Sequence, residues 1–210
     1  MSNKYLIKKT INLFPFIWPK IYVYLRSLIL PISKIENLLP SKGSVLDVGC
    51  GYGFTSVFFA LKNKNRQIFG SELNLKRVLL AQKISSSMLN LSFENSDLIN
   101  KNKLKFNAII AVDLLHHLNC SKKNIFLKDT FLKLKKNGVL VIKDIDKLPL
   151  FKYFWNYIHD LIMTKFSKLY FLSSNQLENL LLKNNFKIIK KGKYKNFFYP
   201  HIFYVCQKKS

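Results

Sequence analysis

The hydrophobic residues of this 210-residue chain form short, continuous apolar runs that alternate with helix-like periodic segments between residues 44 and 144. The runs predict buried strands, and the periodic segments predict helices that each bury one face. Strands are predicted at 44–48, 68–72, 93–97 and 106–113 and in the later part of 134–144, with helices at 55–61, 74–89 and 124–135. Strands that alternate with helices indicate βαβ units, and therefore an α/β fold with a parallel sheet covered on both faces.

The pattern changes after Asp144. An aromatic-rich segment at 147–172 is predicted to be an insert. A helix at 176–184 follows it, with Ser173 or Ser174 as its N-cap, and two strands at 186–190 and 202–207 end the chain.

The first 39 residues are predicted to form an apolar helical extension that precedes the main domain at 40–210. Residues 11–39 are rich in apolar and aromatic side chains, but prolines and basic residues interrupt them, so no run reaches the ~20 apolar residues of a membrane-spanning helix. No signal peptide is expected, because the apolar run is broken and no small-residue cleavage site stands out. Two interpretations remain: helices that pack over the sheet edge and a substrate pocket, or an anchor at a membrane surface. In the second, basic side chains would lie near lipid headgroups, namely Lys4, Lys8, Lys9, Lys20 and Arg26.

The net charge of +24 has two explanations. The first is a polyanionic partner, such as RNA or an acidic membrane, which a positively charged protein attracts. However, 32 of the 35 basic residues are lysines, and lysine, asparagine, isoleucine and phenylalanine all have AT-rich codons, so genome composition also explains it. Nucleic-acid readers favour arginine, which is scarce here.

The three cysteines, Cys50, Cys120 and Cys206, are scattered and odd in number. They indicate neither a disulfide framework nor a zinc site, and they fit a reducing cytosol. No metal site is therefore predicted, and a nucleophilic role for Cys50 is not favoured.

A glycine-rich turn follows the first predicted strand: Gly49, Gly51 and Gly53 alternate directly after Val45–Val48. Glycines let a backbone turn sharply and approach a ligand closely, because no Cβ stands in the way. In an open parallel sheet, ligands bind at the carboxyl ends of the strands. The pattern predicts a small-molecule pocket near residue 50.

This G-x-G-x-G turn, with Asp47 two positions before the first glycine, resembles the first motif of the class I S-adenosylmethionine-dependent methyltransferases. Four further segments resemble later motifs of that family in the same order: 68–72, 93–97, 106–118 and 134–144. In the last of these, Lys136 and Asn137 replace the Pro and first Gly of the usual L-K-P-G-G. The resemblance implies a Rossmann-like three-layer sandwich with a mostly parallel seven-stranded sheet and a C-terminal antiparallel hairpin. It also implies that the 147–172 insert is lid-like.

The resemblance implies S-adenosylmethionine as cofactor and assigns residues to it. The backbone of Gly49, Gly51 and Gly53 would lie along its methionine end, and Asp47 would hold its ammonium group or orient the loop by accepting backbone N–H groups. Glu72 would accept both ribose hydroxyls, unless it is an ordinary surface carboxylate. Asp97 and the N–H of Leu98 would bind the adenine, and Asp113, at the end of the fourth strand, also faces this cleft.

A general base is needed only if the methyl acceptor arrives protonated. The candidates are His116, His117 and His159, because histidine titrates near neutral pH. His116 and His117 cannot both face one acceptor, since neighbouring helical residues point about 100° apart. Polar packing beside the pocket is the alternative role for each.

Three functions remain open. The preferred one is methyl transfer to a small-molecule or lipid-like apolar acceptor, because the N-terminus and the insert could roof an apolar pocket. The alternatives are an RNA methyltransferase acting on ribose or a ring nitrogen, and a non-catalytic S-adenosylmethionine-binding protein. A cytoplasmic location is expected, with peripheral contact at the inner membrane surface as an additional option.

Overall fold

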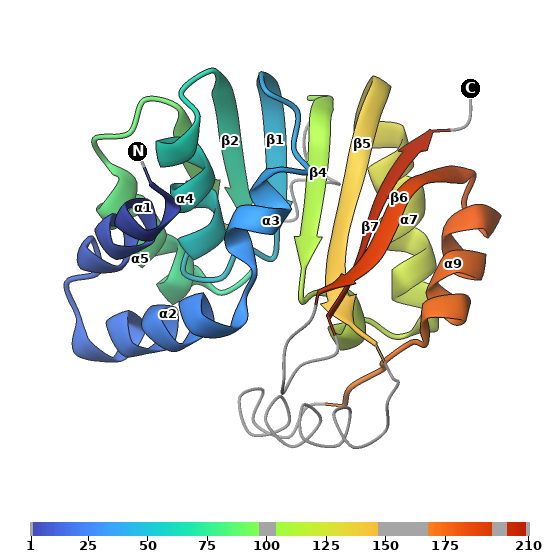
Figure 1. Cartoon of the computed structure of the whole chain (residues 1–210), viewed down its shortest axis with the longest axis horizontal. Helices are drawn as coiled ribbons and strands as arrows, with labels where there is room; N and C mark the ends of the chain where they lie inside the picture. Colours follow the sequence, from blue (N-terminus) through green and yellow to red (C-terminus); the bar gives the residue numbers. More distant parts are fainter. Residues whose placement is uncertain (1, 97–103, 147–167, 195–200, 209–210) are drawn as a thin grey trace. The chain divides into compact units, whose positions relative to one another are not determined.

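A computed structural model describes residues 2–96, 104–146, 168–194 and 201–208 (Figure 1). It contains a seven-stranded sheet with the strand order β3-β2-β1-β4-β5-β7-β6. The pairs that include β7 are antiparallel, and β1, β2 and β3 pair in parallel. The predicted α/β Rossmann-like fold with a C-terminal antiparallel hairpin is therefore confirmed. The chain divides into two compact units, Met1–Ile110 and Ala111–Ser210, which are described separately below.

The first unit is built on three parallel strands and the helices between them. Its main elements are β1 (Gly43–Val48), α4 (Phe54–Lys62), β2 (Arg66–Ser71), α5 (Leu75–Ser85) and β3 (Leu91–Glu94). Within β1, Val45 and Leu46 are completely buried, as the continuous apolar run predicts. The helix α4 is buried from Phe54 to Ala60, which explains why its sequence is apolar on every side.

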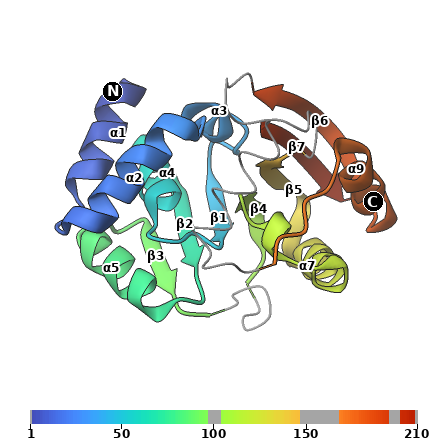
Figure 2. The ribbon, with the colours of Figure 1, turned by 90° about the horizontal axis from the view of Figure 1, so that it is seen from below.

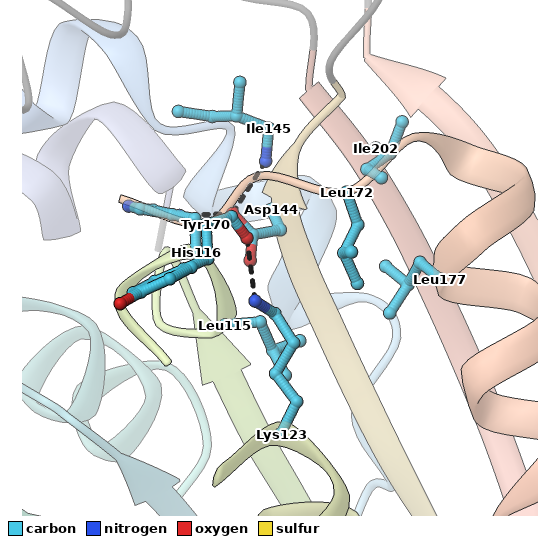
Figure 3. A pocket seen from close by; sticks show the side chains of 9 residues that line it. All are labelled: Leu115, His116, Lys123, Asp144, Ile145, Tyr170, Leu172, Leu177 and Ile202. Carbon is cyan, nitrogen blue, oxygen red and sulfur yellow. Dashed lines mark hydrogen bonds and ion pairs between the residues drawn. The ribbon is translucent and has the colours of Figure 1, made fainter. Parts of the chain in front are cut away.

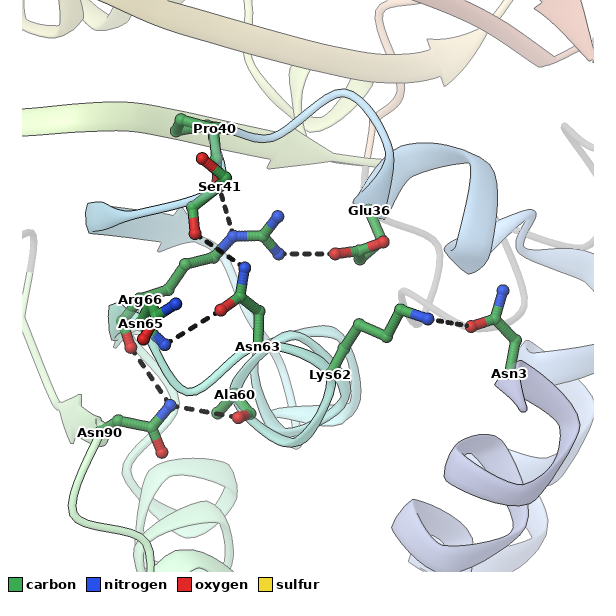
Figure 4. A network of polar contacts seen from close by, with 10 residues as sticks. All are labelled: Asn3, Glu36, Pro40, Ser41, Ala60, Lys62, Asn63, Asn65, Arg66 and Asn90. Carbon is green, nitrogen blue, oxygen red and sulfur yellow. Dashed lines mark hydrogen bonds and ion pairs between the residues drawn. The ribbon is translucent and has the colours of Figure 1, made fainter. Parts of the chain in front are cut away.

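Three helices precede β1: α1 (Asn3–Asn12), α2 (Ile17–Ile29) and α3 (Ile32–Glu36). The side chain of Ser2 caps α1 by accepting a hydrogen bond from the N–H of Tyr5. Figure 4 shows the polar contacts that attach α1 to α4, through Asn3 and Lys62, and α3 to β2, through Glu36 and Arg66. The Arg66 guanidinium binds the buried Glu36 carboxylate at 2.7 Å and the Pro40 carbonyl at 2.6 Å. The chain that enters β1 is thereby attached to the first residue of β2.

The second unit contains the antiparallel end of the sheet. Its elements are a short 3₁₀ helix η1 (Leu115–His117), α7 (Cys120–Lys133), β5 (Leu134–Ile145), α9 (Ser174–Lys183), β6 (Phe186–Tyr194) and β7 (His201–Lys208), whereas β4 (Phe106–Val112) spans the boundary between the units. In β5 and β7, Val141 lies opposite Val205. The capping box of Ser173 and Gln176 confirms Ser173 as the N-cap of α9.

Several boundaries in the second unit differ from the prediction, and β6 extends four residues further than expected, to Tyr194. The helix α7 begins at Cys120, four residues early, because the Asn119 side chain caps it by accepting the N–H of Lys122. The strand β5 begins directly at Leu134, and Asn137 adopts a left-handed φ of 61° where the usual family motif has glycine. Asparagine tolerates this conformation better than most residues, so the replacement preserves the turn of the backbone. No helix within the described ranges is long and apolar enough to span a bilayer.

Candidate active site

The glycine turn lies between β1 and α4 in the first unit. Gly49, Gly51 and Gly53 have φ values of 70°, 59° and 82°, in the left-handed region that favours glycine. A Cβ on Gly53 would lie 2.6 Å from the Phe93 ring, so this glycine is required by packing. A Cβ on Gly51 would meet no atom within 4 Å. The turn therefore has a packed side at Gly53 and an open side at Gly51, and the open side fits the close approach of a ligand to the backbone.

Asp47 is 1% exposed and lies beneath this turn. Its Oδ2 atom accepts hydrogen bonds from the hydroxyls of Thr55 and Ser56, both at 2.6 Å. The sequence-based alternative was that Asp47 accepts backbone N–H groups of the loop, whereas the structure places side-chain hydroxyls of α4 on it. Burial raises the pKa of Asp47, although these two hydrogen bonds and the charge of Arg26 act in the opposite direction.

Glu72 lies just after β2 and holds the glycine turn in place. Its Oε2 atom accepts the N–H of Gly51 at 3.0 Å, and its Oε1 atom accepts the N–H of Asn74 at 2.9 Å. The Arg77 guanidinium lies 4.0 Å from Oε2 and also stacks over the ring of Tyr52. Glu72 is therefore more than a surface carboxylate, because it connects β2 to the open side of the turn. Nothing in the sequence indicated the bond between Glu72 and Gly51, which are 21 residues apart.

Several predicted site residues are not located by the structure. Asp97, Leu98 and His159 lie outside the described residues. Cys50 is buried in the glycine turn, and burial raises the pKa of its thiol well above 9.0, which argues against a thiolate nucleophile there.

Asp113 is the first predicted site residue along the chain in the second unit. It follows β4 with a φ of 53°, which is strained for a non-glycine residue, and its N–H donates to the Lys143 carbonyl at 2.9 Å. Its carboxylate forms an ion pair with the Lys143 ammonium, whose side chain is 1% exposed. Lys143 was not predicted as a site residue, because a lysine inside an apolar strand motif carries no sign of its partner.

His116 is brought together with Asp144, the last charged residue of β5. Its Nδ1 atom lies 2.5 Å from Asp144 Oδ1, and both side chains are buried. The ring stacks on Phe171 with a centroid distance of 4.9 Å and an interplanar angle of 7°. His117, the other histidine of η1, is exposed, so the structure separates the roles of the two neighbours.

Figure 3 shows His116 and Asp144 in a pocket whose other walls are mainly apolar. The lining side chains come from η1, α7, the end of β5, the segment before α9, α9 itself and β7: Leu115, His116, Lys123, Asp144, Ile145, Tyr170, Leu172, Leu177 and Ile202. A histidine paired with a carboxylate among aliphatic side chains, as His116 is with Asp144, can exchange a proton with a molecule that is partly apolar.

Lys123 closes one side of this pocket. Its side chain is buried, and its ammonium group donates to the carbonyls of Leu118 and, at 2.7 Å, Tyr170. The N–H of Tyr170 in turn donates to the His116 carbonyl at 2.7 Å. Burial lowers the pKa of Lys123, and the charge of Asp144 opposes that shift. These bonds attach the segment 168–172 to the helix that carries His116.

The donor set does not resemble a metal centre. Within the described ranges, no three His, Cys, Asp or Glu side chains are grouped so that they could hold a metal ion. The polar groups of the site are instead arranged as pairs, which suits the binding of an organic cofactor and the transfer of protons.

Comparison with known proteins decides the family. A family model described as "Methyltransferase domain" matches residues 19–191, which is most of the chain. The chain belongs to the class I S-adenosylmethionine-dependent methyltransferases. It is accordingly an S-adenosylmethionine-dependent methyltransferase that binds this cofactor.

One curated methyltransferase is similar in sequence. The chain is 35% identical over 99 residues to the ribosomal RNA small subunit methyltransferase G of Mycoplasmopsis pulmonis. The match includes 47% of this chain and 42% of that protein, so it spans less than half of the relative.

Solved methyltransferase structures share the fold at low sequence identity. The magnesium protoporphyrin IX methyltransferase of Synechocystis, solved with bound S-adenosylhomocysteine, has a TM-score of 0.63 and 19% identity, covering 89% of this chain and 82% of that one. A methyltransferase from Methanosarcina mazei has a TM-score of 0.66 and 20% identity, with 85% and 97% covered. The pyocyanin biosynthetic protein PhzM has a TM-score of 0.73 and 13% identity, with 97% and 62% covered. These likenesses support the fold of the methyltransferase and leave its acceptor open.

Proposed function

We propose that this methyltransferase transfers a methyl group to a small-molecule or lipid-like apolar acceptor, with His116 as the general base. The observation that carries the proposal is the His116–Asp144 pair in a pocket with aliphatic walls. Apolar side chains around such a pair would suit an acceptor with an apolar body and one polar group that loses a proton, once the narrow pocket opens to admit it. The scattered, free cysteines favour a reducing compartment such as the cytoplasm.

The first unit would hold the cofactor, which supplies an electrophilic methyl group on a sulfonium ion. The open side of the turn at Gly51 admits a ligand to the backbone, and Glu72 fixes that part of the turn while each of its oxygens retains a further lone pair for a ribose hydroxyl. Asp47 would face the ammonium group with Oδ1, since its hydrogen bonds to α4 use Oδ2. These side chains align the cofactor rather than react with it.

The second unit would handle the proton of the acceptor. His116, held at Nδ1 by Asp144, would take the proton of the acceptor as the methyl group is transferred. Asp144 would then stabilise the charged imidazolium. The stacked Phe171 fixes the ring plane, so less ordering is needed at the moment of reaction. His117, which is exposed, is assigned no proton transfer here.

RNA is the second candidate acceptor, because a specific observation favours it. The curated relative is a ribosomal RNA methyltransferase, and the net charge of +24 suits a polyanion. The match covers less than half of either chain, and arginine is scarce, so we rank RNA second.

The experiment that tests this ranking is transfer of a labelled methyl group into a fractionated extract of the source cell. We expect label in the organic-soluble pool, and we expect His116→Gln to abolish most of it without weakening cofactor binding. A matched variant, His117→Gln, should keep the activity. Label in RNase-sensitive material would contradict the proposal and indicate RNA as the acceptor. Full activity of His116→Gln would contradict the role of His116 as general base.

A further inference from the structure

The helix α2 exposes its apolar face. Ile17, Ile21, Tyr24, Leu25 and Leu28 recur at three- and four-residue spacing, which places them on one side of a helix. All of them are exposed, from 45% at Ile21 to 70% at Ile17, and Trp18 beside them is 79% exposed. Only Val23 is buried within α2. This arrangement reverses the usual pattern of a surface helix, whose apolar face is turned to the core.

The N-terminal segment that contains this face has basic residues and no acidic ones before Glu36. Residues 1–35 contain six basic residues and no acidic residue, namely Lys4, Lys8, Lys9, Lys20, Arg26 and Lys34. Lys20 is exposed on α2 itself, and Lys83 of α5 reaches over the ring of Phe16, just before α2. An apolar, Trp-containing face in a basic segment, with Lys20 and Lys83 beside it, complements an anionic lipid surface, where the rings and aliphatic chains sink below the headgroups and the ammonium groups stay among them.

The flank of α2 that carries Tyr22, beside the exposed face, contacts the cofactor turn. The ring of Tyr22 packs edge-on against that of Tyr52 with centroids 5.4 Å apart, and Tyr52 lies between Gly51 and Gly53. Figure 2, seen from below, shows α2 lying across α4, the helix that begins at this turn. Because a helix with its side chains is about 10–12 Å across, a surface bound to the exposed face would lie within about that distance of the contact with the cofactor turn.

We propose that α2 is a membrane-docking helix whose exposed apolar face lies in the headgroup region of an anionic phospholipid surface. Docking in this way holds the glycine turn within one helix diameter of the lipid. Docking of α2 does not depend on the identity of the methyl acceptor, although docking would bring the enzyme to a lipid-like acceptor. Binding is therefore measured without cofactor or acceptor, so that a failure of docking and a failure of the proposed acceptor can be told apart.

The test is flotation of the purified full chain with vesicles of phosphatidylcholine alone or with about one third phosphatidylglycerol. We expect binding to the anionic vesicles, with an affinity that falls as salt is added. The triple variant Trp18→Gln, Leu25→Gln, Leu28→Gln should bind about tenfold more weakly or worse, because it removes the exposed apolar surface. It should still fold, since it replaces only exposed side chains. In a Trp155→Phe background, the fluorescence of Trp18 should shift to the blue on vesicle addition.

A matched control removes exposed apolar side chains elsewhere. Ile125 and Leu132 of α7 are 55% and 64% exposed, and the variant Ile125→Gln, Leu132→Gln should bind vesicles like the wild type. Equal binding by the α2 variant, or no binding by the wild type, would overturn the proposal. The proposal would also be overturned if the wild type does not bind vesicles but forms a concentration-dependent dimer that the α2 variant abolishes. The face would then be an interface between copies of the chain.

Discussion

Asp47 is a residue where stability and function oppose each other. Its carboxylate is almost completely buried, and the two hydroxyls that bind it are neutral. Burying a charge without a close ionic partner is unfavourable, which is why the pKa of Asp47 is raised from its usual value of 3.8. A raised pKa means that the folded protein holds this proton more tightly than the unfolded chain does, so ionisation of Asp47 lowers stability as the pH rises.

The variant Asp47→Asn should therefore be more stable at neutral pH, by about 1 kcal/mol, because it accepts the same hydroxyl bonds without a buried charge. This corresponds to a Tm roughly 2–4 °C higher. The advantage should be full above the raised pKa and should disappear as the pH falls toward 3.8, as followed by thermal melts at several pH values. Cofactor affinity should fall at the same time. A less stable variant at neutral pH, with the wild-type fold retained, would show that the charge is well compensated.

Helices and strands were predicted well where a local sequence pattern, such as an apolar run or a capping box, determines them. The strands β1 and β4 are continuous apolar runs, and the capping box at Ser173 marks the start of α9 in the sequence itself. The start of α7 was missed because Asn119 and the polar residues after it show no apolar periodicity. The partners of the site side chains were harder to predict. Lys143 and Asp113 are 30 residues apart, His116 and Asp144 are 28 apart, and Gly51 and Glu72 are 21 apart, so only the folded chain brings these partners together.

The segment 168–172 illustrates how one buried lysine joins two elements. Lys123 of α7 donates to the Tyr170 carbonyl, and the Tyr170 N–H donates to the His116 carbonyl. The variant Lys123→Met keeps the length of the side chain and removes both donors, so the Tyr170 amide should exchange its hydrogen about tenfold faster. Lys122→Met is the matched control, because its side chain is exposed. Unchanged exchange at Tyr170 in Lys123→Met would mean that other contacts hold this segment.

At the scale of the whole molecule, the net charge of +24 is spread along the chain and does not by itself select a partner. What distinguishes the N-terminal region is the combination of basic residues with an exposed apolar face on α2. The two compact units divide the chemistry: the glycine turn and Glu72 belong to the first, and the His116–Asp144 pair belongs to the second. The family motifs carried no information about the exposed side of α2.

We propose that the glycine turn held by Glu72 binds the cofactor, and calorimetric titration with S-adenosylmethionine measures this binding. The wild type is compared with Glu72→Ala and with a control, Glu178→Ala, whose carboxylate pairs with Lys191 in the second unit. Loss of the ribose bonds and of the Gly51 contact should weaken binding of Glu72→Ala by about 1–3 kcal/mol, which is roughly 5- to 150-fold, while the control binds like the wild type. Wild-type affinity in Glu72→Ala would contradict the account of the cofactor site.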